Sequence, residues 1–549
     1  MQLKRFKILT SFRGLPAGYE IDFDSRVSPP KHAIEPLCFV GLNGSGKSNA
    51  LEVIAEIFYY LETYHRSELK NVDNFRTGFG FEIDYCLPRF AIEMARIEFI
   101  ELSATWESLE DIALIKIVKA PKELPVIGIT VGNTNLTIQN KDSNRNVSIL
   151  PARIVAYSSG MNELVSNPFI KIDFHYFEDF NKKAGESTDS ALNMNRMFFM
   201  DFNANELITL CNFLFAQSDI YREGVKTITD ALRIKDLASF TIHIQLRTPN
   251  NQVPKVPSEL NQAINNLRQC ATFDESHTES AKGQTFQYHK LTYWVNDATK
   301  KAFQTYFHTA FELYRKLYFL NLLNINLFSR ELRKQIREVK SGINLSDLLP
   351  KYENNKRLFH IGDLKFSKNG TDEKVFYRHL SDGEHQLMQV MGTLVLMDTE
   401  GTLFILDEPE THFNPGWRSR FVSLLNDCVE KDRKNQEIVL TSHSPFIVSD
   451  CRSEKVIVFR NIDGVVNAKS VAELYPNFNT RGTSVNLITS KIFGRKETIG
   501  DYALNEIEKY RQRFNEGEDV ESLKEEINED FGDSIEKLLL IKEISQPKK

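Results

Sequence analysis

The segment Gly41–Ser48, "GLNGSGKS", constrains the fold of this chain more than any other feature, because it matches G-x-x-x-x-G-K-[ST] in full. The apolar run "LCFV" precedes it, and the residues after it have apolar positions spaced for one face of a helix. A strand, a glycine-rich loop and a helix in this order predict a phosphate-binding loop. The sequence therefore predicts an α/β protein built around this loop.

The residues of this loop have separate predicted roles. Lys47 can reach the β- and γ-phosphates of a nucleotide, and the Ser48 hydroxyl can ligate Mg²⁺. The predicted ATP contacts of this segment are Asn43, Gly44, Ser45, Gly46, Lys47, Ser48 and Asn49. A glycine-rich turn before a helix is the alternative interpretation, and the flanking strand and helix favour the phosphate loop.

Two further strand ends carry polar residues suited to the same nucleotide. In "TLFILDEPETHFNP", four apolar residues precede Asp407 and Glu408, so both carboxyl groups are expected at the carboxyl end of a buried strand. Asp407 can hold Mg²⁺, and Glu408 can act as general base on the attacking water. The next strand, "EIVLTSH", ends at His443, which is predicted to donate to the γ-phosphate.

The stretch "HLSDGEHQLMQVMGTLVLM" predicts a helix that begins near Ser381, with apolar residues at i, i+3, i+4, i+7 and i+8. Free N–H groups and the positive dipole end favour an anion at such a helix start. Together with the other motifs, this loop resembles the signature loop, LSGGQ or LSxGE, of the ATP-binding-cassette (ABC) ATPases. The resemblance implies that Ser381, Gly383 and Glu384 contact ATP held by a second subunit, in a homodimer or a higher oligomer of ATPase dimers.

The motifs "FKILTSFRG", "FVGLNGSGKSNALEVI", "LSDGEHQLM", "DEPETHFNP" and "TSHSPF" resemble the RecF, chromosome-maintenance (SMC) and OLD branch of that superfamily. The resemblance covers roughly residues 1–155 and 365–460. It implies that Arg13 contacts phosphate, with a surface arginine as the alternative. No glutamine fits the Q-loop of this branch, since "IVAYSSG" stands in its place, and Asn414 stands where histidine is commoner.

Within this branch, size and motif set resemble the PtuA family, the ATPases of Septu anti-phage systems and of some retron operons. That resemblance implies a separate HNH nuclease subunit of the PtuB kind as partner, and in a retron setting a reverse transcriptase with its msDNA. The alternatives are a DNA-repair ATPase of the RecF or SMC kind and an OLD-like ATPase without its own Toprim nuclease. A DxD carboxylate pair, which that nuclease requires, does not follow His443 in the sequence.

The sequence suggests four regions. The N-terminal half of the ATPase head is expected at 1–158, a mainly helical insertion at 159–355, the C-terminal half of the head at 356–465, and an acidic helical region at 466–549. No apolar run is long enough for a membrane span, and six scattered cysteines without CxxC spacing indicate a reduced, cytoplasmic protein.

Charge is distributed unevenly. The formal net charge of −6 equals the excess of acidic residues after residue 500, so bulk charge does not favour nucleic acid. The helix "FSRELRKQIREVK" places Arg330, Arg333, Lys334, Arg337 and Lys340 on one face. This basic helix is either a solvated, ion-paired face or a nucleic-acid contact. The acidic tail is either a docking site for a partner or a set of solvated helices.

Overall fold

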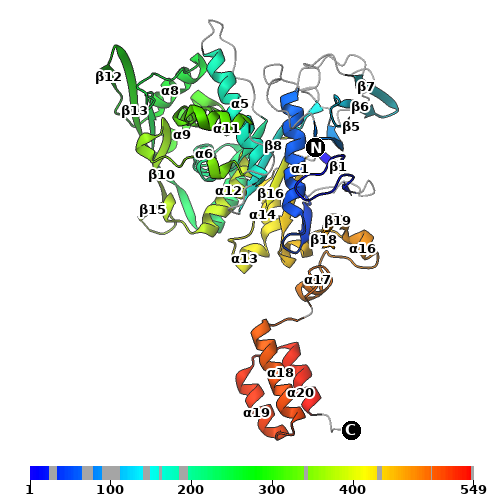
Figure 1. The fold of residues 1–549 in the computed structure, drawn as a ribbon. Coiled ribbons are helices and arrows are strands. Elements are labelled where there is room, and N and C mark those ends of the chain that lie inside the picture. The colour runs from blue at the N-terminus through cyan, green and yellow to red at the C-terminus, as the bar shows by residue number, and fades with distance from the viewer. Residues whose placement is uncertain are drawn as a thin grey trace.

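The computed structural model describes residues 1–23, 34–64, 78–88, 112–139, 149–159, 164–184, 196–338, 344–371, 373–397, 399–429, 436–495 and 497–545. Three sheets and their helices form the main body, and a small helical unit lies apart from it at the C-terminal end (Figure 1). The predicted α/β class is confirmed.

A seven-stranded sheet forms the centre of the head. Its order is β19 (Val465–Ser470), β18 (Val456–Ile462), β3 (Leu37–Gly41), β17 (Glu437–Ser442), β16 (Thr402–Asp407), β8 (Arg153–Ser158) and β9 (Met197–Phe199). All neighbours pair in parallel except β18 and β19. The apolar runs of β3, β16 and β17 are buried along their whole length, as expected for strands covered on both faces.

An antiparallel sheet forms a second layer of the head. Its order is β2 (Glu20–Asp22), β1 (Gln2–Ile8), β4 (Phe81–Pro88), β5 (Ile112–Lys119), β6 (Val126–Val131) and β7 (Thr134–Gln139). Helix α1 (Lys47–Tyr64) contacts strands of the central sheet and packs Phe58 and Tyr60 against rings of β4. Packing on two sides explains why α1 is apolar around most of its circumference. The expected strand in "ARIEFIELSATW" lies outside the described residues.

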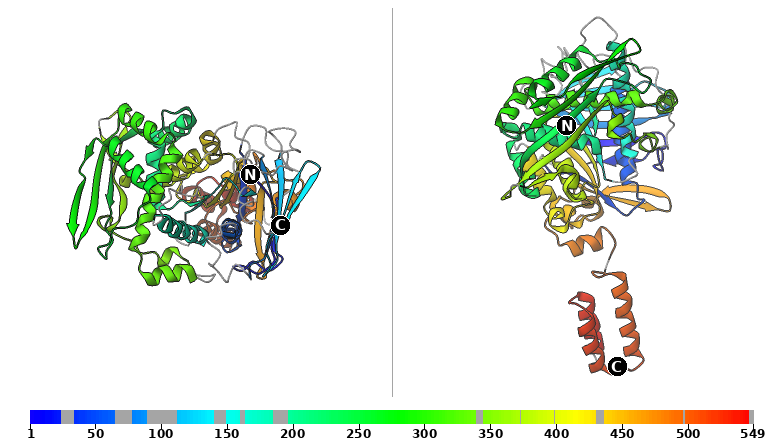
Figure 2. Two further views of the ribbon diagram at one scale, coloured as in Figure 1. Left: turned by 90° about the horizontal axis from the view of Figure 1, so that it is seen from above. Right: turned by 90° about the vertical axis from the view of Figure 1, so that its left-hand side faces the viewer.

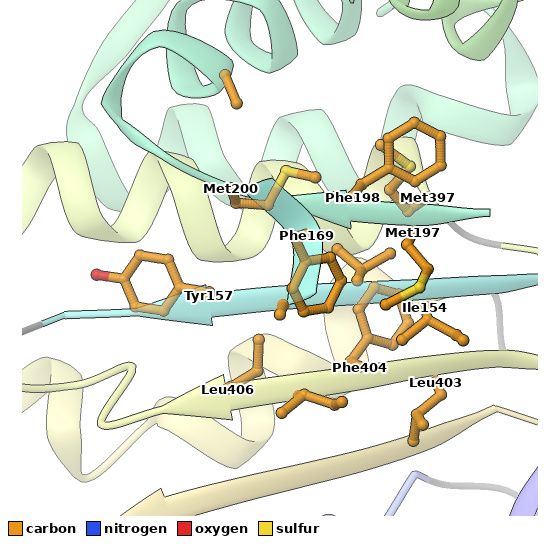
Figure 3. Packing of buried hydrophobic residues seen from close by; sticks show 14 of the residues in the cluster. Ile154, Tyr157, Phe169, Met197, Phe198, Met200, Met397, Leu403, Phe404 and Leu406 are labelled. Atoms are coloured by element: carbon orange, nitrogen blue, oxygen red, sulfur yellow. The ribbon is translucent and has the colours of Figure 1, made fainter. Parts of the chain in front are cut away.

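Helices of the head also pack against helices of the insertion. The head supplies α12 (Asp382–Leu396), α13 (Pro415–Arg418), α14 (Phe421–Cys428), α15 (Pro445–Asp450), α16 (Val471–Leu474) and α17 (Val485–Lys491). The insertion supplies α5 (Asn167–Lys183), α6 (Phe202–Leu214), α7 (Asp219–Leu232), α8 (Ser258–Cys270), α9 (Asp297–Phe307), α10 (Ala310–Leu322) and α11 (Arg330–Glu338). Figure 3 shows apolar side chains of β8, β16 and β9 packed together with Phe169 of α5 and with Met397, which follows α12.

The insertion also carries an antiparallel sheet. Its path is β11 (Phe273–Asp274), β13 (Gln284–Trp294), β10 (Ile234–Gln245), β14 (Phe359–Lys368) and β15 (Lys374–Phe376), with β12 (His277–Ala281) paired to β13. Because β14 pairs with β10, this sheet crosses the boundary expected between residues 355 and 356. The sequence predicts strands in "FTIHIQLRT", "LFHIGDLKFS" and "KVFYRHLS", but not their pairing in one sheet, since these segments are distant along the chain.

The C-terminal unit consists of α18 (Asp501–Asn515), α19 (Val520–Asp530) and α20 (Ile535–Ile544). It has a hydrophobic core of its own, which includes Ile507, Leu523 and Leu540. The sequence predicted charged helices here. In the described part of the chain, no helix combines the length and the apolar character needed to cross a bilayer.

Candidate active site

Four parallel neighbours of the central sheet end at the same edge. In the register, Asp407 at the end of β16 lies opposite Ser158 of β8 and Thr441 of β17, and Ser442 lies opposite Val40 of β3. The phosphate-binding loop continues directly from β3. The sheet therefore brings together at one edge the phosphate-binding loop and two strand-end motifs. Both motifs lie more than 300 residues after the loop in the sequence.

The loop needs glycine at the point where it leaves β3. Gly41 has φ of 151°, and a Cβ atom there would lie 2.4 Å from the carbonyl oxygen of Phe459 on β18. Gly44 and Gly46 have φ of 75° and 95°, in the region that favours glycine. The Lys47 Nζ donates to the carbonyl oxygens of Gly41 and Leu42 at 3.1 Å each, and burial lowers its pKa.

Ser48 and Asp407 meet at the base of the loop. The Ser48 Oγ donates to Oδ1 of Asp407 at 3.0 Å, and Thr441 Oγ1 donates to the same oxygen at 2.6 Å. Ser158 Oγ lies 3.4 Å from Oδ2. Burial raises the pKa of Asp407, while the hydroxyl groups of Thr441 and Ser48 oppose that rise.

These oxygen donors fit Mg²⁺. Magnesium is usually bound by one or two carboxylates together with hydroxyl, water and phosphate oxygens, rather than by a cage of protein ligands. Accordingly, the described residues contain no group of three or more His, Cys, Asp or Glu side chains placed to hold a metal. Ser48 and Asp407 are the side chains that would hold the ion.

Glu408 and His443 form the second pair at this edge. His443 Nε2 lies 3.3 Å from Oε1 of Glu408, and this neighbouring ring is the main cause of the lowered pKa of Glu408. Glu408 has φ of 49°, which is strained for a residue with a side chain, and its N–H donates to Thr441 Oγ1 at 2.9 Å. Both side chains line a pocket of about 230 Å³ and are about one third exposed. An ionised, solvent-accessible carboxylate in this position can accept a proton from a water molecule.

The turn at Ser381 caps helix α12 as the sequence predicted. Ser381 and Glu384 form a capping box, in which the Ser381 N–H donates to Oε2 of Glu384 at 2.7 Å. Ser381 is exposed, whereas Gly383 is buried. A Cβ atom at Gly383 would lie 2.7 Å from the carbonyl oxygen of His412, so α12 packs closely on the loop that follows Glu408.

The remaining predicted contacts lie around the loop and α1. Arg13 forms an ion pair with Glu52 of α1 at 2.9 Å, and its carbonyl oxygen accepts a hydrogen bond from Asn49 at 2.6 Å. The structure thus brings Arg13 to the start of α1 but pairs it with a carboxylate. Ser45 is buried, its Oγ has no partner among the described residues, and Asn43 is exposed.

Sequence reasoning missed four residues of this region. Ser158 and Thr441 contact Asp407, and Gln386 of α12 accepts from the His412 N–H at 2.8 Å and donates to the Tyr157 hydroxyl at 3.0 Å. Glu410 is buried, accepts from Ser442 Oγ, and has its pKa raised to about 7 by burial. Ser158 and Thr441 could have been found from their place at the ends of buried strands.

The basic helix α11 has a partly structural role. Arg333 Nη2 donates to the carbonyl oxygens of Ile325 and Asn326 at 3.2 Å each, which fixes this side chain against the insertion. Arg330 and Lys334 are exposed. Lys340 lies outside the described residues.

The fold and the strand-end residues together form a candidate nucleotide-binding site of the P-loop type. A family model described as "AAA domain, putative AbiEii toxin, Type IV TA system" matches residues 259–449, a segment that includes Ser381, Asp407 and His443. The chain is also similar to protein ea59 of Escherichia phage lambda, with 25% identity over 169 residues. That alignment spans 30% of this chain and 30% of the phage protein, so the chain matches about a third of the relative's length.

Among solved structures, the chain is similar to SMC head domains. A structure of the SmcHead bound to the C-winged helix domain of ScpA gives a TM-score of 0.34 at 9% identity, covering 86% of this chain and 100% of that one. The SMC head domain from Thermotoga maritima gives 0.29 at 11% identity, covering 86% and 99%. The fold description above rests on the sheet order and the loop geometry.

Proposed function

We propose that this protein is an ABC-type ATPase in which two subunits close on two Mg-ATP molecules. The observation that carries the proposal is the meeting of Ser48 with Asp407 at 3.0 Å and of Glu408 with His443 at 3.3 Å at one sheet edge. A phosphate loop, a metal-binding pair and a base are the parts that hydrolysis of a γ-phosphate requires.

Each residue has a role in this proposal. The loop N–H groups and Lys47 bind the phosphates, and Ser48 and Asp407 hold Mg²⁺, which supplies charge neutralisation when bound. Glu408 takes the proton of the attacking water, and His443 keeps that carboxylate ionised and donates to the γ-phosphate. Ser381 is exposed at the start of α12, next to the buried Gly383, and a helix N-terminus can bind the γ-phosphate of the other subunit.

Glu408→Gln tests the base. Its amide cannot accept the proton, so we expect turnover to fall by roughly 10²-fold or more while ATP binding persists. The trapped ATP should hold the subunits together, which light scattering would detect as an ATP-dependent increase in mass. Glu516→Gln, at an exposed carboxylate that follows the last residue of α18, is the matched control. Normal turnover in Glu408→Gln would contradict the assignment.

We further propose a PtuA-like role in anti-phage defence, in which nucleotide state controls a separate HNH nuclease. The support is the motif set of the head combined with an insertion that carries helices and a sheet. Purification of the tagged chain from cells that express its native operon tests this role. An HNH subunit, with or without a reverse transcriptase and msDNA, should co-purify.

A repair ATPase of the RecF or SMC kind is the second candidate. The similarity of the head motifs to that branch favours it. It predicts repair proteins in the same purification and no nuclease subunit, so the two outcomes separate the candidates.

A further inference from the structure

The sheet of the insertion has one covered face and one open face. On the covered face, Phe240 and Tyr293 are fully buried, stack at 4.3 Å between ring centroids, and contact Phe303 of α9. Figure 2 (right) looks at the insertion from its outer side, and there the strands of this sheet lie in front of the helices. The other face is therefore turned towards solvent.

The strand register identifies the residues of the open face, because directly opposite residues share a face. His243 lies opposite both Lys290 and His360, Tyr288 lies opposite His277, and Phe273 lies opposite Thr292. Trp294 lies two residues beyond Thr292 on the same strand, hence on the same face. We call the residues Phe273, Trp294, His277, Tyr288, His243 and His360 the open ring face.

Two large rings of the open ring face are strongly exposed. Trp294 is 58% exposed and Phe273 is 50% exposed, and their centroids lie 5.1 Å apart. Aromatic side chains bury large areas in cores and at binding sites, so an exposed pair on an open sheet indicates a surface that another molecule covers.

A pocket of about 220 Å³ lies beside these rings. His243, His360, His277 and Tyr288 line it together with Arg357. The rings occur as two parallel pairs, His243 with His360 at 4.5 Å and His277 with Tyr288 at 5.0 Å. These flat side chains form part of the pocket wall, a shape suited to a flat ligand.

One histidine of the pocket has unused hydrogen-bonding capacity. Nδ1 of His360 has no partner among the described residues. Burial lowers the pKa of His360 to about 4, so its ring is neutral at pH 7 and has one donor and one acceptor. The edges of nucleobases offer the complementary groups.

Cations border the open ring face. Lys290 pairs with Glu275 at 2.7 Å and Arg247 pairs with Glu279 at 3.1 Å, and the side chains of both pairs are substantially exposed. Exposed ion pairs contribute little stability and can exchange partners. A phosphate backbone that runs over the sheet would thus find basic groups next to aromatic rings.

We propose that the open ring face binds single-stranded nucleic acid, with unpaired bases stacked on its rings and phosphates beside Lys290 and Arg247. Aromatic rings on an antiparallel sheet bind unpaired bases in this way, and base stacking does not depend on sequence. A duplex hides its base faces, so it is not the expected ligand. The inference does not depend on the proposed ATPase cycle.

Fluorescence anisotropy with labelled 20-nucleotide oligo(dT) and oligo(U) tests the proposal on the full chain. The wild-type protein should bind oligo(dT), oligo(U) or both. Comparing the two affinities shows whether the ligand is DNA or RNA. Because each base stacked on an aromatic ring adds substantially to affinity, the double variant Phe273→Ala/Trp294→Ala should bind at least about tenfold more weakly. Lys290→Glu should weaken binding and reduce its salt dependence.

Tyr502→Ala is the matched control, since Tyr502 is 80% exposed but lies on α18. Both rings of the double variant are at least half exposed, so it should fold, and an unchanged melting temperature would verify this. Unchanged affinity of the folded double variant would overturn the proposal. So would the absence of binding to both strands, or binding that a hairpin duplex displaces as well as the single strand does.

Discussion

At the scale of single residues, two glutamates of "DEPE" have opposite environments. The pKa of Glu408 is lowered, chiefly by the neighbouring His443 ring, whereas burial raises the pKa of Glu410 to about 7. The sequence alone treats these carboxylates as equivalent. The two pKa values move apart because Glu408 faces the pocket, whereas Glu410 is buried and faces Ser442.

His443→Ala tests the coupling of His443 to Glu408. Loss of the imidazole that lies 3.3 Å from the carboxylate should leave this carboxylate poorly oriented, so turnover should fall by roughly tenfold or more while Mg-ATP affinity changes little. Steady-state hydrolysis and equilibrium binding of a fluorescent ATP analogue measure the two effects. His443→Gln, which keeps a donor, should be the less impaired variant. Equal turnover in wild type and His443→Ala would contradict this role.

Glu410→Gln should change how stability depends on pH. The folded-state pKa of about 7 lies above the ordinary value of 4.5, so the folded state holds its proton more tightly and stability declines as pH rises through this range. Gln cannot lose a proton. Between pH 5 and pH 8 the free energy of unfolding should therefore fall by about 2 kcal/mol less in the variant than in wild type. Denaturation curves of both proteins at the two pH values measure this difference in the free energy of unfolding. An identical pH dependence of wild type and variant would contradict the prediction.

At the scale of elements, the start of α12 combines two tasks. Ser381 caps the helix, and in our proposal it also contacts ATP of the second subunit. The capping box and the apolar spacing of α12 were readable from the sequence because both are local. The close approach of Gly383 to His412 was not, because it depends on how α12 packs on a distant loop.

Two substitutions separate these tasks. Ser381→Ala should lower stability by about 1 kcal/mol through the lost cap, whereas Ser381→Asp keeps a capping oxygen and should stay closer to wild type. Both variants should weaken the ATP-dependent association of the two subunits. Ser381→Asp should weaken it more strongly, because the negative charge of aspartate repels the phosphate of ATP. Thermal denaturation and light scattering with ATP distinguish the two effects. Normal association in Ser381→Asp would show that this turn does not contact ATP.

Elements with short-range signals were predicted better than elements with distant partners. Strands β3, β16 and β17 and helix α1 are apparent from apolar runs and the glycine-rich loop. Strands β10, β14 and β15 were predicted, but their assembly with β13 into one sheet was not, because β10 pairs with β14, which lies more than 100 residues further along the chain. Ser158 likewise becomes part of the candidate site only through the pairing of β8 with β16.

At the scale of the whole molecule, three separate surfaces are available for different partners. The head exposes Ser381 at the start of α12, the insertion exposes the open ring face, and the C-terminal unit has its own core. Such a division suits a protein whose nucleotide site controls partners bound elsewhere. The oligomer cannot be derived from one chain, so the shared nucleotide site is the central proposal to test.

The most direct measurement mixes two inactive variants. Lys47→Ala lacks the phosphate-binding lysine and Ser381→Asp lacks a working signature turn, so neither should hydrolyse ATP alone. A mixed dimer would hold one site with an intact loop from one chain and an intact Ser381 from the other. With random pairing, the mixture should recover up to about a quarter of wild-type hydrolysis. A mixture as inactive as its separate components, or full activity of Ser381→Asp alone, would contradict the account.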